Sequence, residues 1–293
     1  MLRARARGAL ALAVIVLAAC SVASSPRPAA TTSAATSTTS TTSSTTQLPH
    51  PRLQDVVDTF TEAQDVAFSV VAVNLTTGER GERLADRVVL SASLYKLFVA
   101  AELLRRIDDA ELFGDASAGD AHGRTVAACV EAMVVDSDNA CGEAGLALVG
   151  FGALDDDLHA AGYPSTSLAE PQHTSAADVA LFLQRAHDGT LNGPGHRSSS
   201  ALLYELLLRQ RVDDRLPQGL PPGTAIAHKT GDRLFWAHDA GIFRAPGGDV
   251  LLAVLSGPWP SPCCDADHPG PAEQLAFRAI AELGSIVYDA SGA

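Results

Sequence analysis

The sequence predicts an α+β fold, in which an antiparallel sheet is faced by the terminal helices and a separate lobe consists of helices. Three observations predict it. A strand pattern rich in Val and Ala occurs early, over residues 65–75, and three more strand patterns occur after residue 224. Apolar residues recur at helical spacing in the long stretch between them. The first strand must therefore pair with the last three across a helical insertion.

The individual elements follow from local composition. Residues 65–75 (DVAFSVVAVNL) end at a hairpin-turn signal, Thr76-Thr77-Gly78. Helical spacing interrupted by Gly, Asp or Pro predicts helices over residues 93–107, 125–135, 140–148, 176–186 and 199–210. Strands are expected over residues 225–230, 237–243 and 250–256, with a turn at 246–248, and a last helix over residues 271–287. A cleft between two such lobes is a usual place for an active site.

The first 51 residues predict export and a tether. Residues 1–19 join three Arg to an apolar run of eleven residues (9–19), which is typical of a signal peptide and shorter than the ~20 residues that span a bilayer. Leu17-Ala18-Ala19-Cys20 resembles a bacterial lipobox, which implies a lipid anchor on Cys20 at the outer face of the cytoplasmic membrane. The alternative is an ordinary signal peptide with an incidental Cys.

Residues 20–51 are rich in Ser and Thr, and residues 31–46 contain nothing but Thr, Ser and Ala. Such side chains bury too little apolar surface to offset the entropy of ordering, so we expect a flexible linker. The folded domain is then residues 52–293.

Charge excludes one class of partner and draws attention to two residues. The 293 residues carry 21 basic and 34 acidic side chains, a formal net charge of −13, and no segment gathers the basic ones into a stripe. We therefore expect no nucleic-acid binding. Only Lys96 and Lys229 are lysines. Because a buried Lys can lose its proton and an Arg cannot, these positions suggest a need for an amine; the alternative is a simple bias towards Arg.

Cysteine usage favours disulfides. An even number of cysteines in an exported chain favours pairing, and three connectivities are possible for Cys129, Cys141, Cys263 and Cys264. We favour Cys129 with Cys141, which bracket a predicted helix end and the following loop. Cys263 and Cys264 are then a strained neighbour bridge or two free thiols, and a metal site is the alternative because three potential ligands follow, Asp265, Asp267 and His268.

The first motif that carries chemistry is Ser93-Leu94-Tyr95-Lys96, at the start of a predicted helix. Residues three apart share a helix face, and side chains lean towards the N-terminus, so the Lys96 amine is placed over the Ser93 hydroxyl. If burial lowers the pKa of Lys96, its neutral amine can take the Ser93 proton. This motif alone predicts a nucleophile beside its base.

The second motif, Ser137-Asp138-Asn139, lies between two predicted helices. Ser137 and Asn139 can point the same way from a loop, which offers a hydroxyl for proton relay and an amide for a substrate carbonyl, while Asp138 anchors the loop. The alternative is a plain N-cap of the following helix.

The third motif, Lys229-Thr230-Gly231, is expected at the end of a strand. There a cation and a hydroxyl can bind an anionic substrate group, and Gly231 allows close approach to the backbone. The alternative is an exposed strand end that runs into a turn.

The three motifs in this order are the signature of class A β-lactamases and penicillin-binding proteins, and the sequence resembles that superfamily over roughly residues 65–287. The resemblance implies the β-lactamase/D,D-peptidase-like fold, a five-stranded antiparallel sheet with helices on both faces and an all-helical lobe. It also implies that Ser93 attacks a carbonyl to form an acyl-enzyme and that Lys96 activates Ser93.

The resemblance further implies that Ser137 relays a proton to the leaving nitrogen, that Asn139 holds the substrate side chain, and that Lys229 with Thr230 binds the substrate carboxylate. The backbone N–H groups of Ser93 and Asp232 would form the oxyanion hole. Residues 238–242 resemble the strand that follows Lys-Thr-Gly in this family. Arg233 either assists with the anion or is a solvated surface residue.

The sequence departs from the class A pattern where a Glu should activate water for deacylation. Between residues 162 and 174 the only Glu is Glu170, followed by Pro171, and the Asn expected shortly after it is missing. Glu170 is therefore either the deacylation base or an ordinary loop residue.

These residues predict an exported serine hydrolase related to class A β-lactamases, acting on a β-lactam or related amide. Two alternatives stay open: a D,D-carboxypeptidase-like or penicillin-binding hydrolase of cell-wall peptide, and a non-catalytic envelope lipoprotein. We expect a monomer that needs no metal or organic cofactor, with a small-molecule substrate and a membrane contact through the lipid anchor.

Overall fold

The computed structural model describes residues 51–264 and 270–292. The predicted signal peptide (1–19), the lipidated Cys20 and nearly all of the linker lie outside the described residues, as do Asp265, Asp267 and His268 of the alternative metal site. Among the described residues, no helix combines the length and the apolar character that crossing a membrane requires.

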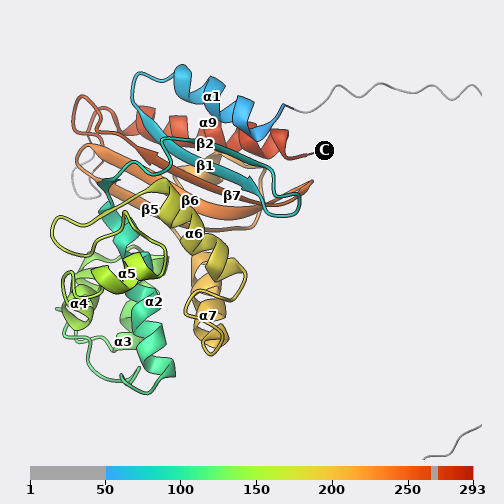
Figure 1. Cartoon of the computed structure of the whole chain (residues 1–293). Helices are drawn as coiled ribbons and strands as arrows, with labels where there is room; N and C mark the ends of the chain where they lie inside the picture. Colours follow the sequence, from blue (N-terminus) through green and yellow to red (C-terminus); the bar gives the residue numbers. More distant parts are fainter. Residues whose placement is uncertain (1–50, 265–269, 293) are drawn as a thin grey trace, which may run out of the picture. The chain divides into compact units, whose positions relative to one another are not determined.

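An antiparallel sheet of five strands forms the centre of the fold, in the order β2-β1-β7-β6-β5 (Figure 1). The strands are β1 (Phe68–Asn74), β2 (Arg80–Arg83), β5 (Ile226–Arg233), β6 (Trp236–Ala245) and β7 (Gly248–Ser256). The early strand β1 pairs along its whole length with β7, from Phe68 opposite Ser256 to Asn74 opposite Val250. The predicted pairing across the helical insertion is thus confirmed.

Helices cover both faces of the sheet, which explains why β1 reads as a continuous apolar run rather than an alternating one. On one face, α1 (Leu53–Glu62) and α9 (Glu273–Ala290) pack against Val70, Ala72 and Val254. On the other face, α6 (Ala176–His187) packs against the sheet, and Val71 and Ala253 join the core of the helical lobe (Figure 1). The central strands β1 and β7 therefore contribute to two separate cores.

The helical lobe is built from α2 (Tyr95–Asp108), α3 (Val126–Val135), α4 (Asn139–Val149), α5 (Asp155–Ala160) and α7 (Arg197–Leu207). The predicted helix 93–107 differs at its start: a single 3₁₀ turn, η1 (Ala92–Leu94), precedes α2 and contains Ser93. The helix predicted over 199–210 begins and ends a little earlier, and the one predicted over 271–287 begins and ends later. Both differences are of the size expected at fraying helix ends.

Several short or polar elements were not predicted. The edge strand β2 has the sequence RGER and three exposed positions, so it carries no apolar pattern. The strands β3 (Val89–Leu90) and β4 (His173–Thr174), which pair with each other, and helix α8 (Leu216–Gly219) are too short for periodicity to show. Helix α1 has buried residues at helical spacing, Leu53, Val57 and Phe60, but no element was predicted from the sequence before residue 65.

One predicted boundary was wrong in a way that matters for the site. The strand expected to end at Thr230 continues to Arg233, because its ladder with β6 extends to the pairs Asp232–Ala237 and Arg233–Trp236. Lys229 and Thr230 therefore lie inside β5 and are fully buried, instead of lying at an exposed strand end.

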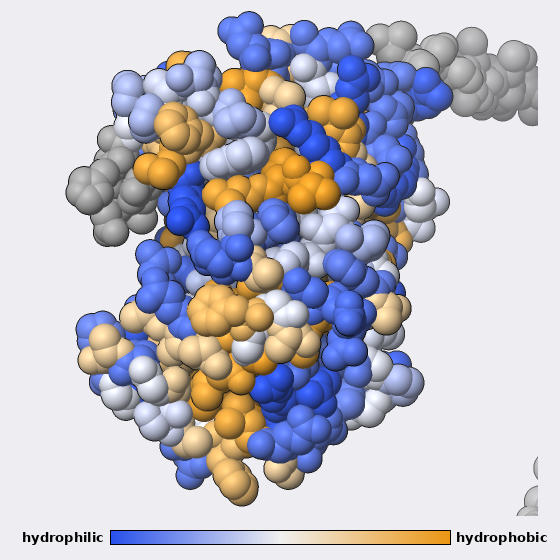
Figure 2. Space-filling model, turned by 60° about the vertical axis from the view of Figure 1, so that its left-hand side comes forward, coloured by the Kyte–Doolittle hydropathy of each residue, from blue (hydrophilic) through white to orange (hydrophobic). Residues whose placement is uncertain are grey.

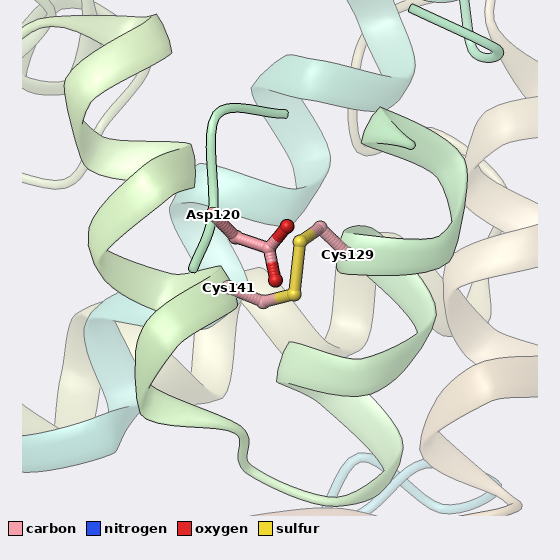
Figure 3. A group of neighbouring side chains, drawn as sticks. All are labelled: Asp120, Cys129 and Cys141. Atoms are coloured by element: carbon pink, nitrogen blue, oxygen red, sulfur yellow. A yellow bond between two sulfur atoms is a disulfide. The ribbon is translucent and has the colours of Figure 1, made fainter. Parts of the chain in front are cut away.

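The favoured disulfide, Cys129–Cys141, is present and joins α3 to α4 across the loop between them. Cys263 and Cys264 form a bridge between neighbours, which was one of the two alternatives for this pair. Figure 3 shows the carboxylate of Asp120 beside the Cys129–Cys141 bridge. Both sulfurs of that bridge are used in the disulfide, so this trio offers no thiolate ligands for a metal.

The double substitution of Cys129 and Cys141 by Ala is expected to lower the free energy of unfolding by about 2–3 kcal/mol, because the bridge closes a loop across a sequence separation of 12. Urea denaturation of the folded domain measures this loss. The matched control replaces Cys263 and Cys264, whose bridge closes almost no loop and should contribute far less. Equal losses for both pairs would contradict this account.

Candidate active site

A cleft of about 650 Å³ brings the three motifs together. Its wall contains Ser93 from η1, Ser137 and Asn139 from the start of α4, and Thr230 from β5. The loop before β4 closes another side with Glu170 and Gln172. On one face of the molecule, Figure 2 shows hydrophilic and hydrophobic side chains interspersed in both its upper and its lower part. The cleft itself is strongly polar, as its lining residues show.

Lys96 lies beneath Ser93 with its side chain fully buried. Its Nζ is 3.2 Å from Ser93 Oγ, 2.5 Å from the carbonyl oxygen of Ser137 and 2.8 Å from Oδ1 of Asn139. A neutral amine has two N–H donors and one lone pair. The two carbonyl-type oxygens can only accept, so they take both donors and leave the lone pair for the Ser93 hydroxyl. The contacts of Lys96 therefore suit a base that accepts the Ser93 proton.

Burial lowers the pKa of Lys96 to about 8, since desolvation disfavours the charged amine, while Asp232 and Asp138 oppose the shift. A substantial fraction of the amine is then neutral near physiological pH. Gly142 on α4 leaves the space that the side chain needs: a Cβ at this position would lie 2.6 Å from Cε of Lys96 and 2.5 Å from the hydroxyl oxygen of Tyr95.

The second lysine, Lys229, lies on the other side of Ser137. Its Nζ donates to Oγ of Ser137 at 2.8 Å and to the carbonyl oxygen of Thr230 at 2.9 Å. Complete burial, together with the nearby charge of Lys96, lowers its pKa well below the ordinary value. Ser137 thus contacts one amine through its carbonyl oxygen and the other through its hydroxyl.

The Ser137 loop is held in an uncommon conformation. Ser137 has φ +56°, in the left-handed region that non-glycine residues rarely adopt. Asp138 accepts the N–H of Cys141 at 2.8 Å, so it caps α4, and it also receives both terminal nitrogens of Arg124. The N-cap alternative and the predicted anchoring role of Asp138 are thus both true. The disulfide at Cys141 adds a further tie to the same loop.

The sheet side of the cleft contains Thr230, Gly231 and Asp232. The Thr230 hydroxyl is buried and has no hydrogen-bond partner within the part of the chain that the structure describes, although the residue lines the cleft. A Cβ on Gly231 would lie 3.1 Å from the carbonyl oxygen of Ser91 and from Cγ of Leu94, so a small residue allows β5 to approach the turn that carries Ser93. Asp232 accepts a hydrogen bond from Arg215 at 2.8 Å.

Arg215 is a site residue that sequence reasoning missed. Its side chain is 2% exposed, lines the cleft and lies over the ring of Phe277 at 4.0 Å. The sequence offered little signal, because Arg215 is one of 19 Arg and follows a loop with no motif. Its burial beside Asp232 becomes visible only once β5 and α9 are packed together.

Glu170 lines the same cleft, but protein groups face both of its carboxylate oxygens. Oε2 accepts from the Gln172 side chain at 2.8 Å, and Oε1 is 3.9 Å from Nη1 of Arg233. The backbone carbonyl of Gln172 also accepts the N–H of Ser91 at 2.9 Å, which ties this loop to the turn before Ser93. Arg233 is 53% exposed, as expected for a solvated residue, yet it contributes to the cleft wall.

Comparisons with known proteins agree with this arrangement. The model of the family described as "Beta-lactamase enzyme family" (Beta-lactamase2) matches residues 50–291. Solved structures with a similar fold include PBP-A, at 21% identity with a TM-score of 0.70, covering 83% of this chain and 98% of that one. An ancestral class A β-lactamase is 23% identical with a TM-score of 0.67, covering 82% and 100%.

A further similar structure is the β-lactamase from Desulfarculus baarsii, at 21% identity with a TM-score of 0.67, covering 81% of this chain and 96% of that one. At these identities the likeness shows the fold. No curated protein matches the chain with significance. The five-stranded sheet and the separate helical lobe are thus the architecture that the sequence predicted.

The reactivity of Ser93 towards an acylating agent such as a penicillin should depend on pH through Lys96. The neutral amine is the active form, so the acylation rate should rise about tenfold per pH unit at low pH and level off above a pKa of about 8. Stopped-flow measurement between pH 5.5 and 9.5 tests this.

Lys96→Arg is the matched variant, because it keeps a positive charge but cannot deprotonate, and it should acylate about 10²- to 10⁴-fold more slowly. A flat profile, or an unimpaired Arg variant, would show that Lys96 is not the base.

Proposed function

The chain belongs to the β-lactamase enzyme family, and from this we propose that it is an exported active-site serine hydrolase, acylated at Ser93 by a β-lactam or related amide. The observation that carries the proposal is the contact set of Lys96, which directs the lone pair of a buried, readily neutral amine at Ser93 Oγ. Such an arrangement activates a serine that is otherwise a weak nucleophile.

In the proposed acylation step, Ser93 Oγ gives its proton to Lys96 and bonds to the carbonyl carbon of the substrate. The backbone N–H groups of Ser93 and Asp232 stabilise the oxyanion. The C–N bond then breaks, and the Ser137 hydroxyl donates a proton to the leaving nitrogen. Lys229 contacts that hydroxyl at 2.8 Å, which supports its role in restoring the proton.

Substrate binding uses the remaining groups of the cleft. Asn139 offers its amide nitrogen to a substrate carbonyl, because its Oδ1 is occupied by Lys96. Thr230 offers a buried hydroxyl that lacks a partner in the described protein. Together these groups suit an extended amide placed along β5.

Hydrolysis of the acyl-enzyme needs an activated water, and Glu170 is the proposed base because its carboxylate lines the same cleft as Ser93. A specific observation favours a second candidate, a penicillin-binding, D,D-peptidase-like hydrolase. Gln172 donates a hydrogen bond to Oε2 of Glu170 at 2.8 Å, so one oxygen of the proposed base is already engaged. A β-lactam would then acylate Ser93 and remain bound for longer.

Intact-mass measurement after brief incubation with benzylpenicillin tests the proposal. We expect an adduct of the mass of the drug on the wild type and none on Ser93→Ala. A transient adduct with hydrolysed drug indicates a β-lactamase, and a persistent one indicates the penicillin-binding alternative. In the first case Glu170→Gln should make the adduct persist.

Absence of any adduct on the wild type with several β-lactams would contradict the proposed acylation. The same measurement on full-length protein from membranes shows whether Cys20 carries the lipid that its lipobox predicts, since the added acyl chains shift the mass of the mature protein.

A further inference from the structure

The end of the cleft next to Thr230 contains a guanidinium that is already paired. Nη2 of Arg215 donates to Asp232 at 2.8 Å, and Nη1 donates to the carbonyl oxygen of His238 at 3.1 Å. Nε lies 3.3 Å from a carboxylate oxygen of Asp214. Two nitrogens of this buried cation therefore donate hydrogen bonds within the described protein, whereas Nε has a carboxylate oxygen nearby but no hydrogen-bond partner there. A substrate anion that approaches Arg215 has to compete with the Asp232 carboxylate.

The charge around this pair is negative. Within the described residues, six carboxylates line the cleft against the two guanidinium groups of Arg215 and Arg233. Three of the six lie at this end, Asp214, Asp232 and Glu273. Burial raises the pKa of Asp214 and of Glu273, and the neighbouring carboxylates add to both shifts. Lys229, behind the wall, opposes this charge only while it is protonated, and burial lowers its pKa.

An independent observation marks the same place as a contact point for substrate. Thr230 is fully buried and lines the cleft, and its hydroxyl has no hydrogen-bond partner among residues 51–264 and 270–292. A buried polar group without a partner is costly, so it is expected to be satisfied by a ligand or by water. A hydroxyl can donate or accept, and it does not itself require a charged partner.

We infer that Asp232 is a specificity-determining residue. Its carboxylate pairs with Arg215 in the way a substrate carboxylate would. This end of the cleft therefore favours substrates whose leaving group is neutral or carries an ammonium group. The inference rests on the proposed acylation of Ser93. A carboxylate placed here meets like charge at close range in a partly desolvated site, where such contacts are weakly screened. The preferred substrates are amides or esters without a carboxylate next to the reactive bond.

Two probes that differ only in this charge test the inference: benzylpenicillin and its methyl ester. The rate of Ser93 adduct formation is measured for both, on the wild type and on Asp232→Asn. The amide oxygen of Asn can still accept from Arg215, so the fold should be kept. We expect the ratio of the benzylpenicillin rate to the ester rate to be about tenfold higher in the variant than in the wild type, because one close charge has been removed.

Two matched variants separate this effect from general changes. Asp232→Glu keeps the charge and should keep the wild-type preference. Asp249→Asn removes one negative charge from an exposed pair with Arg244 outside the cleft lining, and should change neither rate.

The outcomes distinguish the selector role of Asp232 from the proposed acylation of Ser93. If Asp232→Asn leaves the ratio of the two rates unchanged or lowers it, Asp232 is not a charge selector, although acylation of Ser93 stands. No adduct with either probe in any variant overturns the proposed function together with the inference.

Discussion

The site depends on burying one amine without pairing it with a carboxylate. Lys96 is completely buried, and its Nζ contacts two carbonyl-type oxygens and the Ser93 hydroxyl. The lowering of its pKa to about 8 corresponds to about 3 kcal/mol against the charged form. This cost lowers the stability of the folded state, but it makes the amine available as a base. Loss of any one of the three contacts would change its basicity, its position or both.

Much of the surrounding structure serves those contacts. The carbonyl oxygen of Ser137 reaches Lys96 from a residue with positive φ, and Arg124 and the Cys129–Cys141 bridge hold that loop through Asp138 and Cys141. The sheet contributes the second lysine, Lys229, from strand β5. Gly231 in the same strand has no side chain, and this allows β5 to lie close to the turn that carries Ser93. The two lobes therefore meet at Ser137, which contacts both amines.

Features that depend on residues close together in the sequence could be predicted from it, and features that depend on distant residues could not. The Ser93–Lys96 pair depends on three-residue spacing, and the long strands depend on apolar runs, so local patterns predict both. The strand end at Thr230 was misplaced because the pairing of Asp232 with Ala237 is set by β6 and not by local composition. Arg215 and its pairing with Asp232 join residues 17 apart that nothing local connects. The resemblance to a known family gave roles to the three motifs. The balance of charges in the cleft, by contrast, could be seen only in the folded structure.

The central claim is that Lys96 is a neutral base at working pH, and the chain offers a direct test because it has only two lysines. Protein labelled with ¹³C-lysine should give two side-chain Cε signals, assigned by comparison with Lys96→Arg. The account predicts that the Lys96 signal titrates near pH 8, as its burial implies. A Lys96 signal that titrates near the ordinary value of about 10.4 would contradict it, since the amine would then be protonated whenever Ser93 reacts.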